Sequence, residues 1–156
     1  MFREMRRKAQ QLTEAECEDI LNNATSGVLG VFGDDGYPYT VPVSHVFYDG
    51  KIAFHCAKEG HKIDAMMNNP KASFCVYDEG YQEPGDWALY IQSVVVFGKI
   101  EIIEEQEKIY EISRQLSLKF TDDHDYIERE IKNSGPGTFM FALVPEHITG
   151  KRVHEA

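Results

Sequence analysis

Four side chains that can carry a positive charge are crowded into one short stretch: His55, Lys58, His61 and Lys62. The pattern places Gly60 at the start of a short helix, where unpaired N–H groups and the positive end of the helix dipole favour an anion. Gly60 has no side chain to keep a ligand away from the backbone. Lys62 offers a fixed charge, and the histidines can donate hydrogen bonds or become charged beside an anion. The stretch predicts a phosphate site, and the alternative is a solvated loop with scattered charge.

A proline interrupts an alternating strand pattern at Thr40-Val41-Pro42-Val43-Ser44. Proline has no N–H for the hydrogen-bond ladder, so the strand lies at a sheet edge or faces something other than another strand. A flat ring with polar edges could take the free backbone groups as partners. The alternative is an ordinary edge strand in which proline limits aggregation.

Other chemistries of the same stretch are disfavoured. Cys56 lies beside the basic residues, so its pKa could be lowered and its thiol could be nucleophilic. No Asp or Asn partner for a triad can be placed with it, which argues against a thiol hydrolase. The spacing of His55, Cys56 and His61 matches no standard zinc pattern and lacks a fourth ligand, so we expect no metal site. His45 follows Val41 and Val43 on one strand face and is interpreted as a core or interface histidine.

Composition narrows the class of protein further. The chain has 156 residues, with 26 acidic against 16 basic residues and a net charge of −10. Such a charge repels phosphate backbones, so nucleic-acid binding is not expected. No apolar run reaches the length of a bilayer span, and the basic N-terminus leads into polar residues, so neither membrane insertion nor secretion is expected. The 3 cysteines include no CxxC pair, which fits free thiols in the cytoplasm.

The elements that must position these residues can be read from turn signals and hydrophobic spacing. Thr13 and Glu16 form a capping-box pattern that begins a helix over 13–24. An antiparallel meander is expected to follow it, and Gly98 predicts a bulge or sharp bend in a later long strand. Strands are expected over 28–32, 37–48, 51–55, 72–77, 88–103 and 138–144, and further helices over 60–69, 105–120 and 125–132.

These elements predict one domain over residues 1–156, of α+β class and mainly β, built as an antiparallel barrel with flanking helices. The acidic loop from Asp78 to Gly85 lies between two of the strands and has no assigned role. Residues 145–156 are expected to form a polar tail. No GxGxxG or P-loop motif is present, which argues against a doubly wound nucleotide-binding fold.

Several segments together resemble the pyridoxamine 5'-phosphate oxidase-like FMN-binding split-barrel superfamily, and within it the 5-nitroimidazole resistance (Nim-type) flavoproteins. The resemblance covers most of the chain and implies a Greek-key-type split β-barrel. The segments that carry it are Asp35-Gly36-Tyr37-Pro38, Thr40-Val41-Pro42-Val43, Asp49-Gly50-Lys51-Ile52, Phe54-His55-Cys56-Ala57-Lys58-Glu59-Gly60-His61-Lys62, Asn68-Asn69-Pro70-Lys71, Val96-Phe97-Gly98-Lys99-Ile100-Glu101 and Thr149-Gly150-Lys151.

The resemblance implies a role for each matched residue. The backbone from Thr40 to Val43 would lie against the isoalloxazine ring, with His55 and Cys56 contacting the flavin. His61 and Lys62 would form the basic pair that binds the phosphate, where the oxidases favour Arg at the position of His61. Ser93, or its neighbour Gln92, would lie near the flavin.

The resemblance also implies a homodimer with flavin at the subunit interface and a reductase activity. FMN would take electrons from NAD(P)H or another donor and pass them to a small electron-poor substrate, such as a nitroaromatic or a 5-nitroimidazole. His55 is the candidate for substrate contact or proton transfer. The substrate-binding residues of the B6 oxidases have no convincing match, so vitamin B6 oxidation is not predicted. The rival hypothesis is a non-catalytic protein that holds FMN, haem or a deazaflavin.

Overall fold

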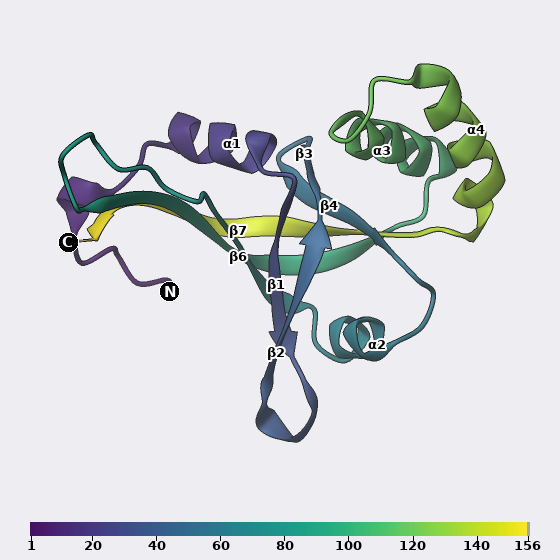
Figure 1. The fold of residues 1–156 in the computed structure, drawn as a ribbon. Coiled ribbons are helices and arrows are strands. Elements are labelled where there is room, and N and C mark those ends of the chain that lie inside the picture. The colour runs from purple at the N-terminus through teal and green to yellow at the C-terminus, as the bar shows by residue number, and fades with distance from the viewer. Residues whose placement is uncertain (156) are drawn as a thin grey trace.

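One curled antiparallel sheet organises the chain in the computed structural model, which describes residues 1–155 (Figure 1). Its 7 strands follow the order β2-β1-β5-β6-β7-β4-β3. The strands are β1 Ser26–Phe32, β2 Pro38–Ser44, β3 Val46–Tyr48, β4 Lys51–Cys56, β5 Lys71–Tyr77, β6 Leu89–Ile103 and β7 Phe139–Glu155.

Four α-helices flank the sheet. They are α1 Glu14–Asn23, α2 His61–Asn68, α3 Gln106–Leu118 and α4 His124–Ser134. The predicted capping box of α1 is present, with the Thr13 N–H donating to Glu16 Oε2 (2.8 Å) and the Glu16 N–H donating to Thr13 Oγ1 (3.2 Å). Figure 1 shows α3 and α4 packed side by side at one end, with α2 below them near the β1–β2 hairpin. The predicted α+β split barrel is therefore confirmed.

Two clusters of buried hydrophobic side chains pack against the sheet. The larger includes the fully buried rings of Phe54, Phe74 and Phe141 inside the curl of the sheet. The smaller joins the inner face of α3, at Ile109 and Ile112, to β3, β4 and β7. Among residues 1–155 no helix combines the length and the apolar character needed to cross a membrane.

β6 and β7 pair along almost their whole length, from Leu89 opposite Glu155 to Ile103 opposite Met140. The register shifts between Phe97 and Gly98, which confirms the predicted irregularity there. The prediction of a polar tail from residue 145 is wrong, because that segment continues β7. It supplies the hydrogen-bond partners of β6.

The segment from Tyr37 to Tyr48 is not one strand. It breaks at His45 into β2 and β3, which lie at the two opposite edges of the sheet, so the predicted continuous meander is wrong beyond β2. His45 is completely buried, with Nε2 2.9 Å from the Leu21 carbonyl oxygen and its ring edge-on to Phe74. Its own carbonyl accepts a 2.9 Å hydrogen bond from Lys119 Nζ. The break is thus fixed by contacts with distant parts of the chain.

Candidate functional site

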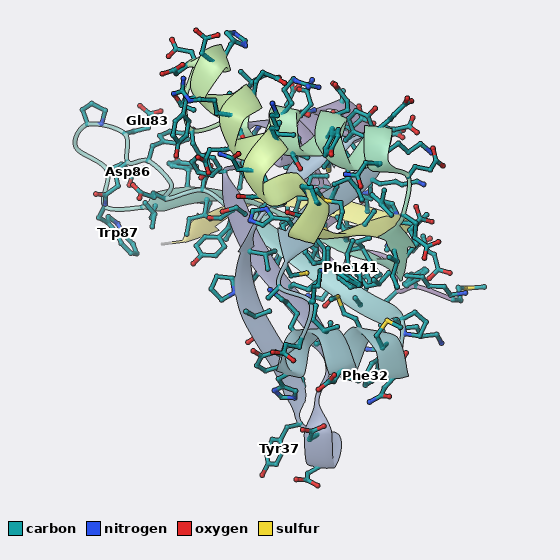
Figure 2. The ribbon with its side chains drawn as sticks, turned by 90° about the vertical axis from the view of Figure 1, so that its right-hand side faces the viewer. Phe32, Tyr37, Glu83, Asp86, Trp87 and Phe141 are labelled. Atoms are coloured by element: carbon teal, nitrogen blue, oxygen red, sulfur yellow. The ribbon has the colours of Figure 1, made fainter. Side chains whose placement is uncertain are left out.

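The exposed edge of β2 and the start of α2 lie close together. The ring of Tyr39, on β2, stacks on the ring of His61 with centroids 4.2 Å apart. The carboxylate of Asp34, in the turn between β1 and β2, has Oδ2 3.5 Å from His61 Nε2. Figure 1 shows α2 beside the β1–β2 hairpin, and in Figure 2 Tyr37 is at the far end of that hairpin. Segments that the sequence analysis treated separately therefore border one region.

The start of α2 is open to a ligand. Gly60 adopts φ +133°, and a Cβ built there would have no atom within 4 Å. The first helical hydrogen bond runs from the Asp64 N–H to the Gly60 carbonyl (3.1 Å), so the N–H groups of residues 61–63 precede the ladder. His61 is exposed and Lys62 is half-buried. Free N–H groups, a lysine and a histidine at an open helix start are a donor set that suits phosphate.

Substituting Gly60 tests whether the backbone at this helix start needs glycine. We expect Gly60→Ala to lower the free energy of unfolding by about 1 kcal/mol, because side chains disfavour this φ. Thermal unfolding would register this as a fall in Tm of roughly 2–4 °C. Gly137 is the matched control, since it has open space and no positive φ. A loss of Tm for Gly137→Ala as large as that for Gly60→Ala would contradict the role of φ.

His55 and Cys56 point to opposite faces of β4. Cys56 belongs to the buried core cluster, whereas His55 keeps an exposed surface. Burial raises the pKa of the Cys56 thiol to about 11, although the charge of Lys62 acts in the other direction. The suggestion that the Cys56 thiol has a lowered pKa is therefore wrong: the thiol is protonated at neutral pH and is a poor nucleophile.

His55 lines a cavity of about 310 Å³ between the sheet and the pair α3 and α4. Partial removal of the His55 imidazole from water lowers its pKa, and the nearby charge of Lys62 lowers that pKa further. The expectation that His55 becomes charged beside an anion stays a prediction; without an anion, the lowered pKa keeps the ring neutral at neutral pH. A neutral imidazole can accept a hydrogen bond or a proton from a ligand.

The strand β2 has no neighbour on its outer side, which confirms the prediction of an edge strand around Pro42. Thr40 and Pro42 are exposed, Val41 is half-buried and Val43 is buried. Val43 therefore contributes to the core, and its contact with a ligand would be through the backbone. Thr40 also borders a second cavity, of about 650 Å³, whose wall includes Phe32, Lys71 and Phe97.

Two predicted cofactor contacts are placed less centrally. Ser93 lies on β6, paired with Tyr77 and Lys151, and the sheet order puts β1 and β5 between it and β2. Lys58 is exposed in the loop before α2. The structure brings together the β2 edge, His61 and Lys62, and it keeps Ser93 apart from them.

Sequence reasoning missed the two side chains that hold His61, which are Asp34 and Tyr39. It also missed the wall that α3 and α4 build opposite His55. The residues around Asp34 are typical of a turn, but nothing in the sequence indicates that this turn contacts α2. No group of 3 or more His, Cys, Asp or Glu side chains within the described part of the chain is placed to hold a metal ion.

Solved structures share this fold at low sequence identity. A conserved hypothetical protein of Mycobacterium tuberculosis matches with TM-score 0.81 and 20% identity, over 95% of this chain and 90% of that one. A proposed 5-nitroimidazole antibiotic resistance protein of Bacteroides thetaiotaomicron matches with TM-score 0.77 and 19% identity, over 93% and 87%. A protein of Mycobacterium smegmatis named as binding FAD and heme matches with TM-score 0.74 and 15% identity, over 91% and 72%.

No curated protein sequence matches the chain. The family model described as pyridoxamine 5'-phosphate oxidase does match it, over residues 13–152. That span runs from the N-cap of α1 into the second half of β7, and so includes the β2 edge, the start of α2 and the His55 cavity. With nearly the whole fold inside the match, the chain belongs to the pyridoxamine 5'-phosphate oxidase family.

Proposed function

We propose that this protein is an FMN-dependent oxidoreductase that reduces small electron-poor substrates, such as nitroaromatics and 5-nitroimidazoles. The observation that carries the proposal is the juxtaposition of the open helix start that bears His61 and Lys62 with the free edge of β2, linked by the Tyr39–His61 stack. The names of two solved structures support it, since one refers to nitroimidazole resistance and another to FAD binding.

Each part of the region has a task in this proposal. The N–H groups at the start of α2, together with Lys62 and His61, bind the phosphate, and Lys58 adds charge nearby. The outer backbone of Thr40–Val43 bonds the polar edge of the ring. His55 lies on the cavity side, where its neutral imidazole contacts the substrate and holds or accepts a proton at a ring nitrogen. Bound FMN supplies the electron-transfer chemistry.

The donor, the assembly and the compartment are part of the same proposal. We take the donor to be NAD(P)H and the assembly to be a homodimer with flavin at the subunit interface. Exposed aromatic side chains around the larger cavity, Phe2, Phe32 and Phe97, support an interface on that face. The free thiols of Cys17, Cys56 and Cys75 support a reducing, cytoplasmic setting.

The absorption spectrum of the purified protein, before and after addition of FMN, tests the cofactor. We expect flavin bands and quenched flavin fluorescence on binding, followed by bleaching on anaerobic addition of NAD(P)H. A colourless protein that ignores FMN would defeat the proposal. Flavin that binds without bleaching would favour a non-catalytic flavin protein.

A second candidate is a haem-binding protein of the same fold. It is favoured by the fold shared with the Mycobacterium smegmatis protein named as binding FAD and heme. A Soret band in the purified protein, or a Soret band shifted and sharpened relative to that of free haemin on titration, would support this candidate. A haemin spectrum unchanged by the protein, in a sample that quenches FMN fluorescence, would exclude it.

A further inference from the structure

The cavity beside His55 is walled by oxygen-bearing side chains, by the aliphatic side chains of Leu116 and Ile131, and by one aromatic ring. Ser113 and Ser117 come from α3, Glu130 and Ser134 from α4, and Phe120 from the chain just after α3. The ring of Phe120 is 60% exposed. A volume of about 310 Å³ lies at the lower end of the range for small-molecule sites.

The formal charge in the lining of this cavity is negative. Glu130 is the single formally charged residue in its lining, because His55 is neutral at neutral pH. Arg114 on α3 is engaged by two other carboxylates, with Nη1 3.0 Å from Glu111 and Nε 2.6 Å from Glu128. No Lys or Arg lines the wall.

Two lysines near the cavity have other partners or tasks. Lys119 donates to the carbonyls of Ala24 (2.6 Å) and His45 (2.9 Å). Lys62 is close enough to act on His55, and its charge opposes a cation in the cavity. Lys62 is not part of the lining, so a ligand in the cavity contacts the Glu130 carboxylate and the serine hydroxyl oxygens but no ammonium group.

We propose that this cavity is the substrate subsite and that it binds a small cationic heteroaromatic ring of the pyridinium type. Glu130 attracts the positive charge, the face of Phe120 stacks on a flat cation, and the serine hydroxyls bond polar ring substituents. An electron-poor ring is also the kind of acceptor that a flavin reductase requires. Phosphate esters and carboxylates are excluded, because they would face Glu130 without a cation in the wall.

As a substrate subsite the cavity rests on the proposed function, but its preference for cations can be measured without flavin. Isothermal titration calorimetry would compare three probes built on the same pyridine ring: 1-methylnicotinamide (cation), nicotinamide (neutral) and nicotinate (anion). We expect the cation to bind at least about fivefold more tightly than nicotinamide, and nicotinate to bind least. Equal affinities for the three probes would overturn the proposal.

Two variants and one control locate the effect. Glu130→Gln keeps the shape of the side chain and should remove the preference for the cation while leaving nicotinamide binding nearly unchanged. Phe120→Leu should weaken binding of the cation by removing the ring face. Asp122→Asn, which removes an exposed charge outside the lining, should bind all three probes as the unmodified protein does. Preference for the cation retained in Glu130→Gln would defeat the proposal even if Phe120→Leu were unstable.

FMN titration of the same samples separates this inference from the proposed function. FMN binding without any preference for the cation would remove only the subsite. A clear preference for the cation in a protein that does not bind FMN would remove the reductase and leave a cation-binding cavity.

Discussion

Acidification is expected to remove about 3 kcal/mol of the free energy of unfolding through His45 alone, between pH 6.5 and about 4. Burial of the ring lowers the pKa of His45 from 6.5 to about 4, against the opposing effect of its hydrogen bond to Leu21. Between these values the unfolded chain binds the proton and the folded protein does not. The stability contribution is therefore complete above the unfolded pKa and is lost as the pH falls toward the folded one.

Urea unfolding at a series of pH values would measure this loss. His45→Gln retains an amide that can donate to the Leu21 carbonyl and cannot titrate, so its stability should fall less steeply with acidification. His124→Gln, at the exposed start of α4, is the control and should keep the pH dependence of the unmodified protein. The prediction fails if His45→Gln loses stability with acid as steeply as the unmodified protein.

Lys62→Ala is expected to weaken FMN binding at least about tenfold, because the phosphate would lose its fixed cation and a charge-assisted hydrogen bond. Fluorescence titration with FMN measures the affinity. A second readout needs no flavin: the charge of Lys62 lowers the pKa of His55, so the variant should raise that pKa in an NMR titration.

The matched control for Lys62 is Lys132→Ala, which removes an exposed lysine from the last turn of α4. It should leave both FMN affinity and the pKa of His55 unchanged. If Lys62→Ala raises the pKa of His55 but binds FMN as tightly as the unmodified protein, Lys62 is near His55 but does not bind the phosphate. That outcome would remove the phosphate site from the start of α2.

Features set by nearby residues could be predicted from the sequence. The capping box of Thr13 and Glu16 depends on residues one helical turn apart, and it forms as predicted. Pro42 marks an edge strand because its missing N–H excludes it from a fully paired one. Gly60 begins a helix and Gly98 marks the register shift, since both positions suit a residue without a side chain.

Features set by distant contacts could not be predicted. The break at His45 depends on Leu21, Phe74 and Lys119, and an alternating pattern carries no information about them. Cys56 was expected to respond to the positive charge beside it, but burial dominates its pKa. The α3–α4 wall of the His55 cavity likewise arises from tertiary packing and leaves no local signal.

The position of β7 in the sheet constrains the order in which the strands can assemble while the chain is being synthesised. It lies between β6 and β4 in the sheet, although β4 precedes it in the chain by the whole of α2, β5, β6, α3 and α4. On the ribosome, the β3–β4 hairpin can therefore form early but cannot join the sheet until residues 139–143, which pair with both β4 and β6, have left the exit tunnel. Until then β4 and β6 each expose an unpaired edge, which is when a nascent chain is most open to aggregation and to chaperones.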